Sequence, residues 1–166
     1  MTEAKPDAIR LLLVDDEEDL VTFLAHRLRK RGIEVAVAVN GQQALDAAAA
    51  RTFDVAVVDL KMPDFDGITV MERLKKNQPF LEVLMLTGHG SHDSAWEAGR
   101  LHAFRYLLKP YDFDELHGLI EQAATQRRQK LSAEFATRLA DLMAGTTSAR
   151  DLIEECDRLR REYEQD

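Results

Sequence analysis

The stretch VAVVDLKMPDFDG, residues 55–67, decides the fold. Its first four residues are apolar and three of them are valines, a pattern typical of a strand that is buried on both faces of a parallel sheet. The run ends at Asp59, and a loop containing Pro63 and Gly67 follows. In open parallel α/β sheets, ligands bind outside the carboxyl ends of the strands. Asp59 is therefore a candidate functional residue, together with any polar residue that ends a neighbouring strand.

The composition is that of one globular domain with a short addition. Of the 166 residues, 45% are hydrophobic and 31% are charged, and a chain of this length can bury a core without disulfides. Cys156 is the single cysteine, and no apolar run approaches the roughly 20 residues of a transmembrane helix. Residues 1–7 form a leader that lacks the apolar core of a secretion signal, so we expect a cytoplasmic protein with no membrane partner.

Strands and helices alternate along residues 8–124. Apolar runs predict strands, and helical stripes of apolar residues follow each of them. The expected strands are Ile9–Val14, Val35–Val39, Val55–Asp59, Leu81–Thr87 and Phe104–Leu108, and the expected helices begin near Leu20, Gln42, Ile68, Asp93 and Asp112. Because right-handed crossovers place each helix over one face of a parallel sheet, this alternation predicts an α/β fold. We expect a flavodoxin-like, doubly wound, five-stranded parallel sheet in the order 2-1-3-4-5, followed by a C-terminal helical extension.

Polar side chains lie at the ends of four of these strands. They are Asp15, Asp16, Asp59, Thr87 and Lys109. In the expected fold they share one crevice, where three carboxylates need a counter-charge such as Mg²⁺ together with the Lys109 ammonium. Mg²⁺ accepts few protein ligands and leaves positions for the oxygens of a phosphoryl donor, and a neighbouring carboxylate can act as the nucleophile. Thr87 and Lys109 could then bind the phosphoryl oxygens.

Four motifs in this order carry a family resemblance. They are LVDD at 13–16, VDLKMPDFDG at 58–67, LTGHG at 86–90 and YLLKP at 106–110. With them, residues 8–124 resemble the receiver domain of two-component response regulators. The resemblance implies that Asp59 accepts a phosphoryl group from a histidine kinase or a phosphotransfer protein. It also implies that Asp15 or Asp16, Asp59 and the backbone carbonyl of Lys61 coordinate Mg²⁺.

The resemblance assigns further roles in the phosphorylated state. Thr87 and Lys109 would bind the phosphoryl group, and Tyr106 matches an aromatic switch position that responds to movement of Thr87. Lys61 and His89 lie two residues beyond Asp59 and Thr87, so we expect them to adjust the lifetime of the aspartyl phosphate. Such a protein promotes its own phosphorylation and dephosphorylation and is not a conventional enzyme.

Residues 125–166 predict helices and leave their arrangement open. Apolar residues continue the last helix at Leu131, Phe135, Leu139 and Leu142; after a break at residues 145–147, a second seam follows at Leu152, Cys156, Leu159 and Tyr163. Ser148 and Asp151 offer a helix cap for the second segment. The second seam has coiled-coil spacing but spans only about two heptads, so a helical hairpin and a short coiled coil that would make a homodimer remain equally open.

The output of the chain is the least specified part. The net charge of −8 opposes nonspecific attraction to nucleic acid, and the tail holds no basic recognition helix, so we do not expect it to bind nucleic acid. We favour a switch that binds a downstream protein partner through the tail, or through the face formed by the helix after Asp93 and the strand Phe104–Leu108. The alternative is a dimeric transcription regulator in which the tail forms the dimer or the output element.

Overall fold

The computed structural model describes residues 8–88, 103–145 and 148–165. In chain order these hold β1 (Arg10–Val14), α1 (Glu18–Lys30), β2 (Glu34–Ala38), α2 (Gly41–Ala50), β3 (Val55–Asp59), α3 (Gly67–Asn77), β4 (Glu82–Thr87), β5 (Arg105–Leu108), α5 (Phe113–Gly145) and α6 (Ala149–Gln165). The leader, His89 and the helix expected from Asp93 lie outside the described residues.

The strands form one parallel sheet in the order β2-β1-β3-β4-β5, which confirms the predicted topology. The register aligns the carboxyl ends of the strands, since Val14 lies beside Val58 and Thr87 lies beside Leu108. Asp15, Asp59 and Lys109 each stand at or just after such an end. The fold therefore brings the residues expected to act together to one edge of the sheet.

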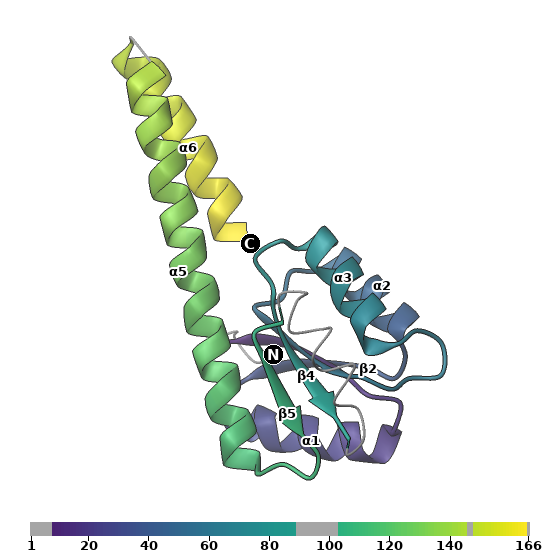
Figure 1. The fold of residues 1–166 in the computed structure, drawn as a ribbon. Helices are drawn as coiled ribbons and strands as arrows, with labels where there is room; N and C mark the ends of the chain where they lie inside the picture. Colours follow the sequence, from purple (N-terminus) through teal and green to yellow (C-terminus); the bar gives the residue numbers. More distant parts are fainter. Residues whose placement is uncertain (1–7, 89–102, 146–147, 166) are drawn as a thin grey trace, which may run out of the picture.

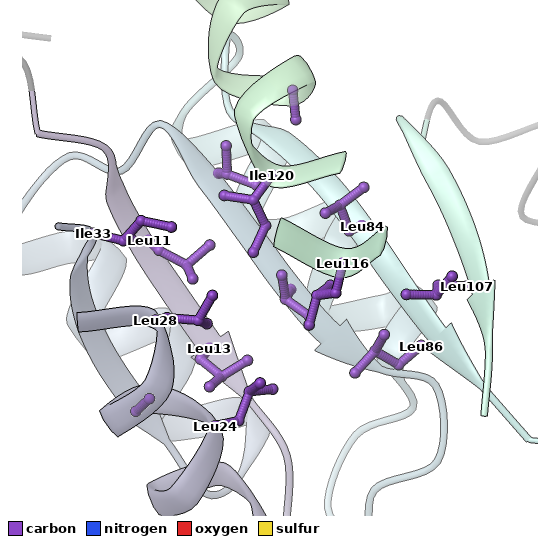
Figure 2. Packing of buried hydrophobic residues seen from close by; sticks show 14 of the residues in the cluster. Leu11, Leu13, Leu24, Leu28, Ile33, Leu84, Leu86, Leu107, Leu116 and Ile120 are labelled. Atoms are coloured by element: carbon purple, nitrogen blue, oxygen red, sulfur yellow. The ribbon is translucent and has the colours of Figure 1, made fainter. Parts of the chain in front are cut away.

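Two apolar layers bury the sheet, one on each face. On one face, α1 and α5 pack leucines and isoleucines against alternate residues of the strands (Figure 2). The residues of this layer that Figure 2 labels are Leu11, Leu13, Leu24, Leu28, Ile33, Leu84, Leu86, Leu107, Leu116 and Ile120. On the other face, α2 and α3 cover the remaining strand residues, among them Ala56 and Val58. Every residue of β3 is buried, as its continuous apolar run predicts.

Local signals in the sequence set several helix ends. Gly32 follows α1 with φ of 85°, a left-handed conformation that ends a helix at low cost for glycine. The side chain of Asp66 accepts a hydrogen bond from the Thr69 amide at 2.7 Å at the start of α3. Asp112 accepts from the amides of Asp114 and Glu115 at 2.9 and 3.0 Å, so it caps α5 as expected.

The extension is a helical hairpin within the single chain. Helix α5 runs for 33 residues, well past the sheet, and α6 folds back along its distal part (Figure 1). Leu131 on α5 and Leu159 on α6 are 8% and 7% exposed, which shows that the apolar seams of the two helices face inward. Within the single chain, α5 and α6 pack against each other as a hairpin, and the short coiled coil between two chains stays a prediction. Among the described residues, no helix combines the length and apolarity needed to span a bilayer.

Candidate functional site

Three carboxylates converge at the carboxyl edge of the sheet. Asp15 and Asp59, which follow or end the adjacent strands β1 and β3, are buried, whereas Asp16 is exposed. One oxygen from each of the three lies within 4.8 Å of the others. The amide of Glu17 donates to Asp15 at 3.0 Å and fixes the direction of that carboxylate. The cluster thus has two oriented, buried acids and one acid that reaches it from solvent.

Lys109 supplies the positive charge of the site. Its Nζ lies 3.3 Å from Asp15 and 3.4 Å from Asp59, so the ammonium bridges the two buried carboxylates. Its backbone amide donates to the carbonyl of Thr87 at 2.8 Å, which holds the residue after β5 beside the end of β4. The side chain is 24% exposed, so the bridge lies at the surface of the crevice rather than inside the core.

The charges at this edge remain unbalanced. Burial raises the pKa of Asp59, Lys109 opposes that rise, and the neighbouring Asp15 adds to it. Burial alone would lower the pKa of Lys109, but Asp59 and Asp15 together hold it above its ordinary value. One ammonium therefore offsets only part of the negative charge of three carboxylates.

The donor set fits a hard divalent cation. The oxygens are carboxylates, and one acid is open to solvent. Burial raises the pKa of Asp59, and the neighbouring Asp15 adds to that rise. Mg²⁺ prefers oxygen ligands and retains several waters, which suits a site with few protein ligands at a solvent-facing edge. Asp15, Asp16 and Asp59 are the residues that would hold it.

The loop after Asp59 is packed tightly against the site. Gly67 lies so close to it that a Cβ there would stand 2.3 Å from the carbonyl oxygen of Asp59 and 2.8 Å from the Cα of Leu60. Its amide donates to the Leu60 carbonyl at 2.8 Å. The Lys61 amide lies 3.5 Å from Asp59, at the outer limit of a hydrogen bond. Glycine at position 67 thus lets α3 begin against the backbone of the candidate phosphoacceptor.

Thr87 and Tyr106 stand on neighbouring strands beside this edge. Thr87 is 1% exposed, and its hydroxyl donates to the Gly88 carbonyl at 3.2 Å. Tyr106 is half-buried on β5, and its hydroxyl is buried with no hydrogen-bond partner among the described residues. An unsatisfied buried hydroxyl is costly, so a rearrangement that gives it a partner would be favourable.

An apolar groove adjoins the acid cluster, and the sequence reasoning missed it. The cavity measures about 300 Å³ and is lined by Leu20, Phe23, Leu24, Arg27, Lys109, Pro110, Tyr111 and Phe113. Phe23 is 60% exposed, and the guanidinium of Arg27 lies 3.7 Å from the centre of the Phe113 ring. Phe23, a large apolar residue on the polar face of α1, was the one sequence signal for this groove. A single exposed phenylalanine is common on protein surfaces, so the signal was weak.

Comparison with known proteins finds relatives in both sequence and structure. The family model described as the response regulator receiver domain matches residues 11–121. The transcriptional regulatory protein ZraR of Escherichia coli O157:H7 is 39% identical over 117 residues, which are 70% of this chain and 26% of that protein. This chain spans only about a quarter to a third of the length of such curated relatives.

Solved structures agree. A response regulator receiver domain protein from Clostridium thermocellum is 31% identical, with a TM-score of 0.70, over 73% of this chain and 98% of its own. The response regulator protein TrrA from Thermotoga maritima, solved in complex with Mg(2+)-BeF, is 28% identical with a TM-score of 0.62, over 69% of this chain and 98% of its own. The similarity thus covers the sheet and the helices packed on it.

Proposed function

Because the chain belongs to the response regulator receiver domain family, we propose that it is a phosphorylation-dependent switch in which Asp59 accepts a phosphoryl group from a histidine kinase or a phosphotransfer protein. The observation that carries the proposal is the bridge from Lys109 to Asp59 at 3.4 Å beside two further carboxylates. A purely structural ion pair would not need a third acid beside the two that Lys109 bridges at a ligand-binding edge.

The reaction is a transfer between two nucleophiles. An oxygen of Asp59 forms a bond to phosphorus while the bond from phosphorus to the donor's imidazole nitrogen breaks, and that nitrogen keeps the electron pair. Lys109 holds the Asp59 carboxylate in place and, after transfer, can donate to the phosphoryl oxygens. Bound at Asp15, Asp16 and Asp59, with the Lys61 carbonyl as a further ligand, Mg²⁺ would offset the negative charge that develops. Lys61 and His89 would adjust the rate of hydrolysis.

The groove beside Lys109 is where we place the donor protein. Lys109 lines both the groove and the acid cluster, so a partner seated on Phe23 and Leu20 would have its reactive group close to Asp59. Burial of such apolar surface provides affinity, while the acid cluster selects the phosphoryl group. A small phosphodonor would bypass the groove and still reach Asp59. We infer that the protein receives its phosphoryl group in the cytoplasm and acts as a phosphoryl acceptor, not as a conventional enzyme.

The output is read from β5 or from the hairpin. Once Thr87 turns its hydroxyl toward a phosphoryl group on Asp59, the space it leaves allows the Tyr106 ring to move, which alters the surface around β5. A downstream protein partner would read that surface or the hairpin. The relatives are named as transcriptional regulators but extend far beyond the part matched here, so they give no support to the expectation that nucleic acid is not bound.

The test is labelling with acetyl phosphate and Mg²⁺, followed by intact mass measurement. We expect the wild type to gain one phosphoryl group and Asp59→Asn to gain none. The matched control is Asp66→Asn, which changes a nearby aspartate to a residue that caps α3 equally well and should label like the wild type.

Two results would contradict the proposal: an unlabelled wild type, or a label that survives in Asp59→Asn. Size-exclusion chromatography of the labelled protein separates the two outputs. A dimer formed only after labelling would favour the dimeric transcription regulator over the stand-alone switch.

A further inference from the structure

Two acidic residues lie at the amino edge of the sheet, opposite the candidate phosphoacceptor. Asp54 directly precedes β3 and Glu82 begins β4. Their backbones are joined, since the Glu82 amide donates to the Asp54 carbonyl at 3.3 Å. The side chains of Asp54 and Glu82 are only 14% and 2% exposed. Acids so well buried require counter-charges, and these come from elements far away in sequence.

Asp54 is held between two arginines. From β1, Arg10 donates its backbone amide to Asp54 at 2.7 Å and its Nη2 at 2.9 Å. From α5, Nη1 of Arg127 lies 3.0 Å from the same carboxylate, and the Arg127 side chain is only 6% exposed. The guanidinium of Arg127 is therefore buried against the sheet, where an unpaired cation would be costly.

Glu82 pairs with a residue of α5 that lies one turn beyond Arg127. Lys130 of α5 forms a close ion pair with Glu82. Lys75 of α3 lies near both: burial lowers the pKa of Lys75, while Glu82 opposes that shift and Lys130 adds to it. Two lysines thus share one buried carboxylate, and α5 contributes the one in direct contact.

These pairs lie beyond the apolar attachment of α5. The core cluster on this face includes α5 residues only as far as Ala124, and the family match ends at residue 121. Arg127 and Lys130 lie one and two turns further along. Leu131, although buried, belongs to neither core cluster of the sheet.

We propose that Asp54 and Glu82 form an ionic clamp that anchors α5 to the amino edge of the sheet through Arg127 and Lys130. The part of α5 that folds and unfolds together with the sheet then extends to Lys130. The hairpin projects away from the sheet only beyond that residue. Because the clamp consists of buried acids, breaking it from the α5 side leaves each carboxylate with one cation fewer. Removing both charges of a pair costs less than removing the cation alone.

The experiment is a double-mutant cycle in the full chain, measured by urea unfolding and by hydrogen exchange. The variants are Lys130→Met, Glu82→Gln and the double variant, and methionine keeps most of the apolar stem of Lys130. The matched control is Arg128→Met, which removes one exposed positive charge on the same helix. We expect Lys130→Met to lower the urea midpoint more than Arg128→Met does, and to raise exchange at residues 125–131 by at least about tenfold over that control.

The double variant keeps the inference testable if single changes are poorly tolerated. We expect Glu82→Gln to cost less stability when Lys130 is already methionine, because the ion pair between the two residues is then already lost. Additive effects, or equal exchange at residues 125–131 in Lys130→Met and Arg128→Met, would overturn the clamp. The same cycle on Asp54 and Arg127, with Asp54→Asn and Arg127→Met, checks the second pair. Neither result depends on whether Asp59 accepts a phosphoryl group.

Discussion

Tyr106 carries a buried hydroxyl that has no hydrogen-bond partner among the described residues, and this has a measurable consequence. Burial raises the pKa of Tyr106 from 10.0 to about 12. The folded protein therefore holds this proton more tightly than the unfolded chain does. That contribution to stability is complete below pH 10 and is lost as the pH rises from 10 to about 12.

We predict that Tyr106→Phe loses less stability than the wild type over this alkaline range, because phenylalanine has no proton to release. At pH 7 the variant should be at least as stable as the wild type, since it removes an unsatisfied hydroxyl that costs about 1 kcal/mol. Urea midpoints measured across the pH series check both points. Parallel pH profiles for the two proteins would show that the hydroxyl is solvated.

At the scale of single elements, the start of α3 holds the loop that follows the candidate phosphoacceptor Asp59. Asp66 caps α3 through its 2.7 Å contact with the Thr69 amide, and Gly67 then packs against the backbone of Asp59. We predict that Asp66→Ala lowers the free energy of unfolding by about 1 kcal/mol, whereas Asp66→Asn leaves it nearly unchanged because asparagine caps equally well. Urea unfolding of the two variants is the measurement. Equal losses in both would mean that the charge of Asp66, and not its cap, stabilises the helix.

At the scale of the whole molecule, a metal ion held by the acid cluster would link folding to metal binding. A cation that binds only the folded state stabilises it by about 1.4 kcal/mol at tenfold its dissociation constant. We predict that Mg²⁺ raises the midpoint of thermal unfolding of the wild type, and that Asp16→Asn reduces this gain. Without Mg²⁺ the same variant should be at least as stable as the wild type, because it relieves repulsion from Asp15 and Asp59.

The measurement is thermal unfolding followed by circular dichroism, with and without Mg²⁺. Glu72→Gln is the matched control, since it removes an exposed acid on α3 that lies outside the cluster. It should leave the Mg²⁺ response of the wild type intact. A response that is equal in Asp16→Asn and in the wild type would remove Asp16 from the metal site.

The sequence predicts this molecule best where topology alone decides the geometry. Once the strand order is known, Asp15, Asp59 and Lys109 must meet, because parallel strands end at one edge. The clamp at Asp54 was not predictable, since its partner Arg127 comes from a distant helix and an arginine in a charged segment gives no local signal. The hairpin was left open because the spacing of Leu152, Cys156 and Leu159 suits an intramolecular and an intermolecular partner equally.

The length of α5 separates the carboxyl edge of the sheet from the far end of the helical hairpin. A helix of 33 residues spans about 50 Å, and the hairpin projects from the side of the sheet opposite the edge where Asp59 lies (Figure 1). A donor seated at the carboxyl edge and a target seated on the hairpin would therefore not compete for space. If Asp59 accepts a phosphoryl group as proposed, phosphorylation would take place on a protein already bound to its target, and the signal would pass within that complex without diffusion of a newly phosphorylated protein.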